Sequence, residues 1–190
     1  MKILVLDLDE TLVYSTLERP PVVDHELLIA EQTCFVRVRP GVQSFVERMR
    51  SCFGECRIWS TGQPIYVESV CKTLGIDWMT IWGRDRCRRL AVPVPGADPY
   101  DKPLELISND PRSIVIVDNA PSVFACNPQN GIPITTWRGD PSDRQLDLIG
   151  DYLEVLSLRE DMRGEHGQWA AQVLIRRNAS SKNVRVSKRQ

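Results

Sequence analysis

The sequence predicts an α/β fold, a three-layer sandwich around a mainly parallel central sheet. Residues 2–6 and 113–117 form two short, continuous apolar runs, which are typical of strands buried on both faces of such a sheet. Strand-length runs alternate along the chain with segments whose apolar residues recur at helical spacing. Polar residues directly follow both apolar runs, so we expect a ligand site at the carboxyl edge of the sheet.

Length, composition and charge narrow the class of protein. The 190 residues, 42% of them hydrophobic, suffice for one core, and a formal net charge of -1 gives no general indication of nucleic-acid or membrane binding. The six cysteines lack Cys-x-x-Cys spacing, so we expect reduced thiols and no zinc site. The first apolar run is too short for a signal peptide, and no stretch approaches the length of a membrane span. We therefore expect a soluble, cytoplasmic protein.

The first apolar run ends in residues 7–12, which read DLDETL. Asp7 and Asp9 place two carboxylates beside one small volume where a buried strand ends. Burying that much negative charge is costly unless a cation shares it, so the pair indicates a bound metal ion. The alternative is a chance Asp-x-Asp that serves a turn.

This string, with residues 13–15 after it, resembles the first motif of the haloacid dehalogenase (HAD) superfamily of phosphatases. It is most similar to the FCP/SCP or NLI-interacting-factor branch, which contains the RNA polymerase C-terminal-domain phosphatases; Tyr14 departs from it, since His is usual there. The resemblance extends from residue 2 to about residue 157 and implies a HAD-like Rossmannoid fold. It also implies that Asp7 attacks phosphorus to form an aspartyl phosphate, and that Asp9 is the general acid and base.

The segment after this motif is expected to be small. A loop over residues 16–24 leads to a hairpin with strands at residues 25–30 and 34–38, and a helix begins near Val42. Residues 38–42 read VRPGV, which is also similar to the FCP/SCP branch. We expect this small hairpin insertion and no large cap domain. HAD enzymes that act on small metabolites commonly have such a lid, and its absence favours a macromolecular substrate that covers the site itself.

A third strand is predicted at residues 56–59, with Ser60, Thr61 and Gly62 at its end. These residues resemble the second HAD motif, in which a hydroxyl bonds the transferring phosphoryl group. We assign that hydroxyl to Ser60, with Thr61 as the alternative. Gly62 would let the main chain approach phosphate, and the helix that starts at Pro64 has an amino end that favours anions. Taken alone, Ser-Thr-Gly is a common turn.

Residues 78–82 predict another strand, and residues 84–89 after it contain four arginines. Such a run is most often a solvated loop. In the FCP/SCP branch an arginine of this segment contacts the substrate, and Arg84 is the matching residue. A loop over residues 91–99 follows.

Residues 100–104 read YDKPL and are expected to open a helix. Lys102 resembles the third HAD motif, the lysine that neutralises nucleophile and phosphate. A lysine is electrostatically unfavourable at the start of a helix, which hints that its charge serves another purpose.

The second buried run is followed by Asp118 and Asn119, which resemble the fourth motif in the Asp-Asn form of the FCP/SCP branch. We assign Asn119 as a direct metal ligand, and Asp118 either as a ligand or as the residue that holds the motif lysine. With Asp7 and the backbone carbonyl of Asp9, this oxygen-only set suits Mg²⁺ better than zinc.

The carboxyl-terminal third is expected to contain an edge strand over residues 132–137 and a helix over residues 140–156. We divide the chain into a phosphatase domain, residues 1–157, and an extension, residues 158–190. The extension is predicted to continue helically but to be broken by Gly164 and Gly167, with Trp169 and Val173 packed back on the body. It ends in a basic tail, interpreted as solvated rather than as an arm for nucleic acid or an acidic partner.

We therefore predict a Mg²⁺-dependent phosphomonoester hydrolase that dephosphorylates phosphoserine or phosphothreonine in protein segments, with Asp7, Asp9, Ser60 and Lys102 as catalytic residues. The arginines of residues 84–89 and the basic tail would also suit a phosphatase of polynucleotide ends or nucleotides. A non-catalytic HAD-like binding module is a further alternative, although the presence of both aspartates speaks against it. A bacterial receiver domain is excluded, because its acceptor aspartate lies on a later strand.

Overall fold

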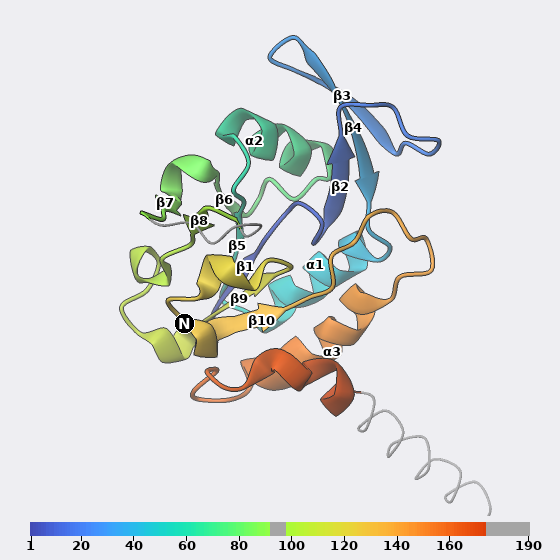
Figure 1. Cartoon of the computed structure of the whole chain (residues 1–190). Coiled ribbons are helices and arrows are strands. Elements are labelled where there is room, and N and C mark those ends of the chain that lie inside the picture. The colour runs from blue at the N-terminus through green and yellow to red at the C-terminus, as the bar shows by residue number, and fades with distance from the viewer. Residues whose placement is uncertain (92–97, 174–190) are drawn as a thin grey trace, which may run out of the picture.

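The centre of the molecule is a five-stranded sheet in which every pairing is parallel, in the order β10-β9-β1-β5-β6 (Figure 1). This computed structural model describes residues 1–91 and 98–173. The strands are β1 Ile3–Leu6, β5 Glu55–Trp59, β6 Thr80–Trp82, β9 Ile114–Asp118 and β10 Gly131–Pro133. Every residue of β1 is buried, as is every residue of β9. The predicted parallel sheet with two strands buried on both faces is confirmed.

The two faces of this sheet are covered differently. Helices α1 (Val42–Cys52), α2 (Pro64–Thr73) and α3 (Gln145–Ser157) contribute to one hydrophobic cluster, with alternate residues such as Leu4 and Leu6 of β1. On the opposite face, Ile3 and Val5 belong to a second cluster, to which short 3₁₀ turns contribute. The three predicted layers are present, and one of the outer layers is thin.

The insertion between β1 and α1 is a small antiparallel sheet of order β2-β4-β3, which projects beyond the central sheet (Figure 1). Its strands are β2 Val13–Thr16, β3 His25–Ile29 and β4 Gln32–Val38. The predicted hairpin is confirmed, and its two-residue turn consists of Ala30 and Glu31, both with positive φ. Strand β2 was not predicted, because VYST lies directly between a motif and a loop.

The predicted helix at residues 100–104 is wrong. Strand β8 (Tyr100–Asp101) pairs antiparallel with β7 (Arg88–Arg89), and the next element is a single 3₁₀ turn, Leu104–Leu106. Pro103 explains the difference, since a residue before proline avoids the helical conformation. The argument from the helix dipole about Lys102 therefore fails.

Two further predictions need correction. Helix α3 starts at Gln145 rather than at residue 140, because the Asp140 side chain accepts hydrogen bonds from the backbone N–H and hydroxyl of Ser142 and holds a turn there. The predicted interruption after α3 begins earlier than Gly164, since residues 158–168 contain no α-helix, and Trp169 and Val173 pack into the core as predicted.

Residues 174–190, which include the basic tail that begins at residue 176, and residues 92–97, most of the predicted loop, lie outside the described residues. Within the described parts of the chain, no helix combines the length and the apolar character needed to cross a membrane.

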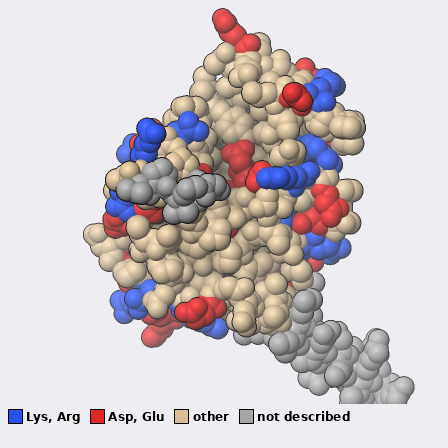
Figure 2. Space-filling model, viewed as in Figure 1, with Lys and Arg blue, Asp and Glu red and all other residues tan. Residues whose placement is uncertain are grey.

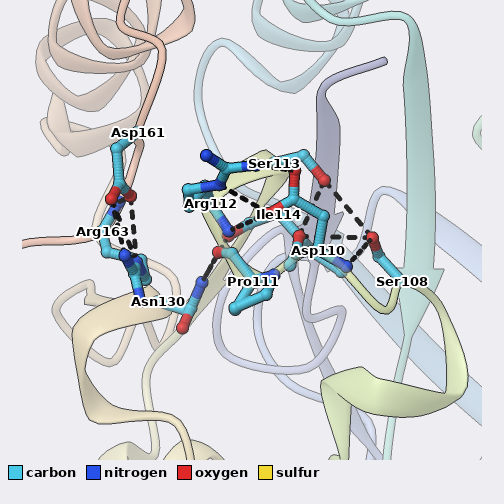
Figure 3. A network of polar contacts seen from close by, with 9 residues as sticks. All are labelled: Ser108, Asp110, Pro111, Arg112, Ser113, Ile114, Asn130, Asp161 and Arg163. Carbon is cyan, nitrogen blue, oxygen red and sulfur yellow. Dashed lines mark hydrogen bonds and ion pairs between the residues drawn. The ribbon is translucent and has the colours of Figure 1, made fainter.

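A polar network fixes the end of the sheet that lies opposite the strands' carboxyl ends (Figure 3). The buried Asn130 side chain donates hydrogen bonds to two carbonyls, Pro111 O at 2.6 Å and Ile114 O at 2.7 Å. Nearby, Met162 N donates to Arg112 O, which joins the segment after α3 to the start of β9. The network therefore links the entries of β9 and β10 to the carboxyl-terminal segment.

We expect Asn130→Ala to lower the free energy of unfolding by about 1–3 kcal/mol, because the carbonyls of Pro111 and Ile114, the second of them buried, lose their donor. Urea denaturation of the variant and of the exposed control Asn109→Ala measures the effect. Equal stabilities for the two variants would contradict the assignment.

Candidate active site

The carboxyl ends of β1, β5 and β9 open onto a cavity of about 250 Å³, lined among others by Asp7, Asp9, Thr61, Lys102, Asp118 and Asn119. Figure 2 shows acidic side chains recessed in the middle of this face, with Lys and Arg side chains on the surrounding surface. Residues from all four predicted motifs therefore meet at one place. Parallel strands explain this, because their carboxyl ends share one edge of the sheet.

Lys102 is the buried cation of the site, with no solvent-exposed surface. Its Nζ lies 2.8 Å from Asp7 Oδ1 and 2.6 Å from Asp118 Oδ2. Burial acts to lower the pKa of Lys102, but the Asp118 and Asp7 carboxylates outweigh it and raise that pKa above its ordinary value. The ammonium group therefore keeps its charge beside Asp7.

Both carboxylate oxygens of Asp118 accept hydrogen bonds from the protein. Besides the bond from Lys102, its Oδ1 accepts a hydrogen bond from the backbone N–H of Ala120 at 2.8 Å. Of the two roles predicted for Asp118, this favours the residue that holds Lys102.

Asp9 is fixed by two hydroxyl groups. Its Oδ1 accepts a hydrogen bond from the phenol of Tyr66 in α2, and its Oδ2 accepts one from Ser60 at 3.1 Å. Burial raises the pKa of Asp9 to about 6; Asp7 adds to this rise, and the Tyr66 hydrogen bond opposes it. A carboxyl group with a pKa near neutrality suits a residue that both gives and takes a proton.

The Ser60, Thr61 and Gly62 segment has a different geometry from the one expected. The Ser60 hydroxyl is buried between Asp9 and the backbone N–H of Gly62, which donates to it at 2.9 Å. Thr61 lines the cavity and donates to Asp98 Oδ2 at 3.0 Å. Thr61 is thus the hydroxyl residue of this segment that faces the cavity, while the phosphate-binding role of Ser60 stays a prediction.

Arg84 contacts the backbone of a residue that lines the cavity. Its Nε donates to the Thr61 carbonyl, and its guanidinium lies 5.4 Å from the centre of the Tyr100 ring. Among the described residues, Arg84 is not part of the cavity wall, so its predicted contact with substrate also stays a prediction.

Sequence reasoning missed Tyr66 and Arg39. Tyr66 lies in the first turn of α2, so its position just after the second motif was a usable signal. Arg39 is buried; it donates to the Thr11 carbonyl at 3.0 Å and pairs with both oxygens of Asp143 at 2.9 Å. It thereby clamps the loop after β1 to the turn before α3. Nothing in the local sequence indicates that clamp, because Asp143 lies far away along the chain.

The donor set of the cavity fits Mg²⁺. Among the described residues, five carboxylate side chains and one lysine line the cavity, so the site has excess negative charge; the five are Asp7, Asp9, Glu10, Asp98 and Asp118. Within the described parts of the chain, no three His, Cys, Asp or Glu side chains form a complete ligand set. Mg²⁺ usually takes one or two carboxylates and completes its shell with waters and substrate phosphate, which suits Asp7 and the Asn119 amide.

Comparisons with known proteins give concordant matches. A family model described as NLI interacting factor-like phosphatase matches residues 2–163. The human "Carboxy-terminal domain RNA polymerase II polypeptide A small phosphatase 1" is 30% identical over 165 residues, which are 83% of this chain and 60% of that protein. The "CTD small phosphatase-like protein 2" of Dictyostelium discoideum is 33% identical over 169 residues, 84% of this chain and 28% of the relative. The chain thus spans less than two thirds of either relative.

One solved structure, titled "The Structure of Fcp1, an essential RNA polymerase II CTD phosphatase", matches with a TM-score of 0.63 and 16% sequence identity. The match covers 81% of this chain and 61% of that chain. At this identity the match supports the fold.

Proposed function

This chain belongs to the family of NLI interacting factor-like phosphatases, and from that premise we propose that it is a Mg²⁺-dependent hydrolase of phosphoserine or phosphothreonine in protein segments. The observation that carries the proposal is the Lys102 ammonium group, which joins Asp7 and Asp118 in a cavity that Asp9 and Asn119 also line.

Asp7 and Asp9 make different contacts, which suit the two residues to different steps of the reaction. Lys102 holds Asp7 Oδ1, which leaves Oδ2 to attack phosphorus. As the new O–P bond forms, the bond from phosphorus to the serine oxygen breaks and Asp9 gives that oxygen a proton. Asp9 then removes a proton from a water molecule, which attacks the phosphorus and releases Asp7. When bound, Mg²⁺ neutralises charge between the Asp7 carboxylate and the phosphate oxygens.

The surroundings of the cavity support a macromolecular substrate. Between β1 and α1 the described chain holds only the small β2-β4-β3 sheet, whose Tyr14 and Ser15 reach the cavity. No covering domain is present among the described residues, so a long substrate chain has access. The names of the curated relatives, which are C-terminal-domain phosphatases, also favour a protein substrate.

Two of the four arginines in residues 84–89 give little support to a nucleic-acid substrate. Arg86 lies over the Trp82 ring at 5.6 Å, and Arg88 pairs with Asp101 and Glu105. These guanidinium groups already have partners within the protein.

A substrate panel tests the proposal. Phosphoserine and phosphothreonine peptides, oligonucleotides with terminal phosphates, and free nucleotides are compared by phosphate release, with Mg²⁺ and with excess chelator. We expect the peptides to be hydrolysed fastest, and all release to stop with chelator. Faster release from oligonucleotides would overturn the protein substrate, and absence of release from every substrate would indicate a binding module.

A further inference from the structure

Glu10 occupies an unusual backbone position at the edge of the cavity. Its φ is 59°, in the left-handed region, where a residue with a side chain is strained relative to the usual conformation. The backbone is held on both sides, since Glu10 N donates to Val13 O at 2.6 Å and Glu10 O accepts from Trp137 N at 2.8 Å. Glycine would satisfy these backbone bonds without strain. The backbone therefore does not explain why a glutamate is present at residue 10, and its side chain needs a functional explanation.

The Glu10 carboxylate lies between two partners. Its Oε2 accepts a hydrogen bond from Asn119 Nδ2 at 3.2 Å, and its Oε1 accepts one from Arg138 Nε at 3.2 Å. Arg138 thus anchors the carboxylate and offsets its negative charge near the cavity.

The other contacts of the Asn119 amide do not define its orientation. Thr11 Oγ1 lies 3.3 Å from Asn119 Oδ1, and Thr136 Oγ1 lies 3.3 Å from Asn119 Nδ2. A hydroxyl group donates or accepts, so both threonines tolerate either orientation of the amide. An ionised carboxylate only accepts. A flipped amide would bring its oxygen against the Glu10 carboxylate, so among the described contacts of this amide only the one with Glu10 selects the observed orientation.

We propose that Glu10 is a positioning residue, which holds the amide nitrogen of Asn119 and thereby keeps the amide oxygen available to Mg²⁺ in the cavity. This inference rests on the proposed function, in which Asn119 is a metal ligand. Partners that orient a metal ligand typically contribute 10- to 100-fold to metal affinity.

Titration calorimetry with Mg²⁺ tests the inference without any substrate. Four proteins are compared: wild type, Glu10→Gln, Asn119→Asp, and the double variant. A glutamine at residue 10 can present either its amide oxygen or its amide nitrogen to Asn119. Glu10→Gln therefore no longer favours one orientation of the Asn119 amide. We expect it to weaken Mg²⁺ binding by about 10-fold when residue 119 is Asn. The loss should be several-fold smaller when residue 119 is Asp, because a carboxylate has no amide to orient.

A charge control completes the design. Asp98→Asn removes another cavity carboxylate, which contacts Thr61 and not the amide of Asn119, and we expect a smaller loss of affinity from it. Equal losses for Glu10→Gln in the two backgrounds would overturn the inference and show a general charge effect. If Asn119→Asp does not fold, equal losses for Glu10→Gln and Asp98→Asn decide against it in the same way. Absence of Mg²⁺ binding by wild type would overturn both this inference and the metal assignment, while hydrolysis itself is tested separately through Asp7.

Discussion

Asp7→Asn is expected to lose turnover of a chromogenic aryl phosphate by about 10⁴-fold or more, because a neutral amide replaces the attacking carboxylate. Asparagine has the same shape, and its amide oxygen can still accept the hydrogen bond from Lys102. The variant should therefore fold, which circular dichroism can verify. Initial rates at saturating Mg²⁺ give the measurement.

The matched control for this experiment is Asp85→Asn. Asp85 is exposed, and its carboxylate forms a surface pair with Arg86 at 3.6 Å. We expect this variant to keep the turnover of wild type. If Asp7→Asn were equally active, the hydrolase proposal with Asp7 as nucleophile would be refuted.

Lys102→Met is expected to lower the free energy of unfolding by about 3–5 kcal/mol, because two buried carboxylates lose the cation between them. Asp7 and Asp118 are both almost fully buried, so water cannot replace the lost ammonium group. Methionine keeps most of the volume, which limits the effect of packing. Guanidinium or urea unfolding at neutral pH measures the change.

Lys72→Met serves as the comparison, since Lys72 is exposed on α2. Surface substitutions of this kind usually change stability by less than about 0.5 kcal/mol. Equal unfolding free energies for Lys102→Met and Lys72→Met would mean that the buried ion pairs contribute nothing to stability.

The sequence predicted the central sheet well because its two apolar runs carry an unambiguous signal. Residues 3–6 and 114–117 are uniformly apolar, and the structure pairs β1 directly with β9. Once both are parallel strands, Asp7 and Asp118 must lie at the same edge, so the convergence of the motifs follows from topology.

Other parts of the site depend on contacts between distant segments and could not be predicted in that way. Arg39 reaches Asp143 across 104 positions of the chain, and Tyr66 reaches Asp9 across 57. No local periodicity encodes such pairs. The error at residues 100–104 has a local cause, since the preference of a residue before proline was given too little weight.

The place of β1 in the sheet has a consequence for how the protein loses activity on heating. Neighbours hydrogen-bond to β1 on both sides, and Asp7 N continues the ladder by donating to Val117 O at 3.0 Å. Amide protons in so protected a strand are expected to exchange with solvent chiefly through global opening of the domain. The proposed nucleophile therefore stays in position as long as the fold does, and thermal inactivation should coincide with complete unfolding rather than with local fraying.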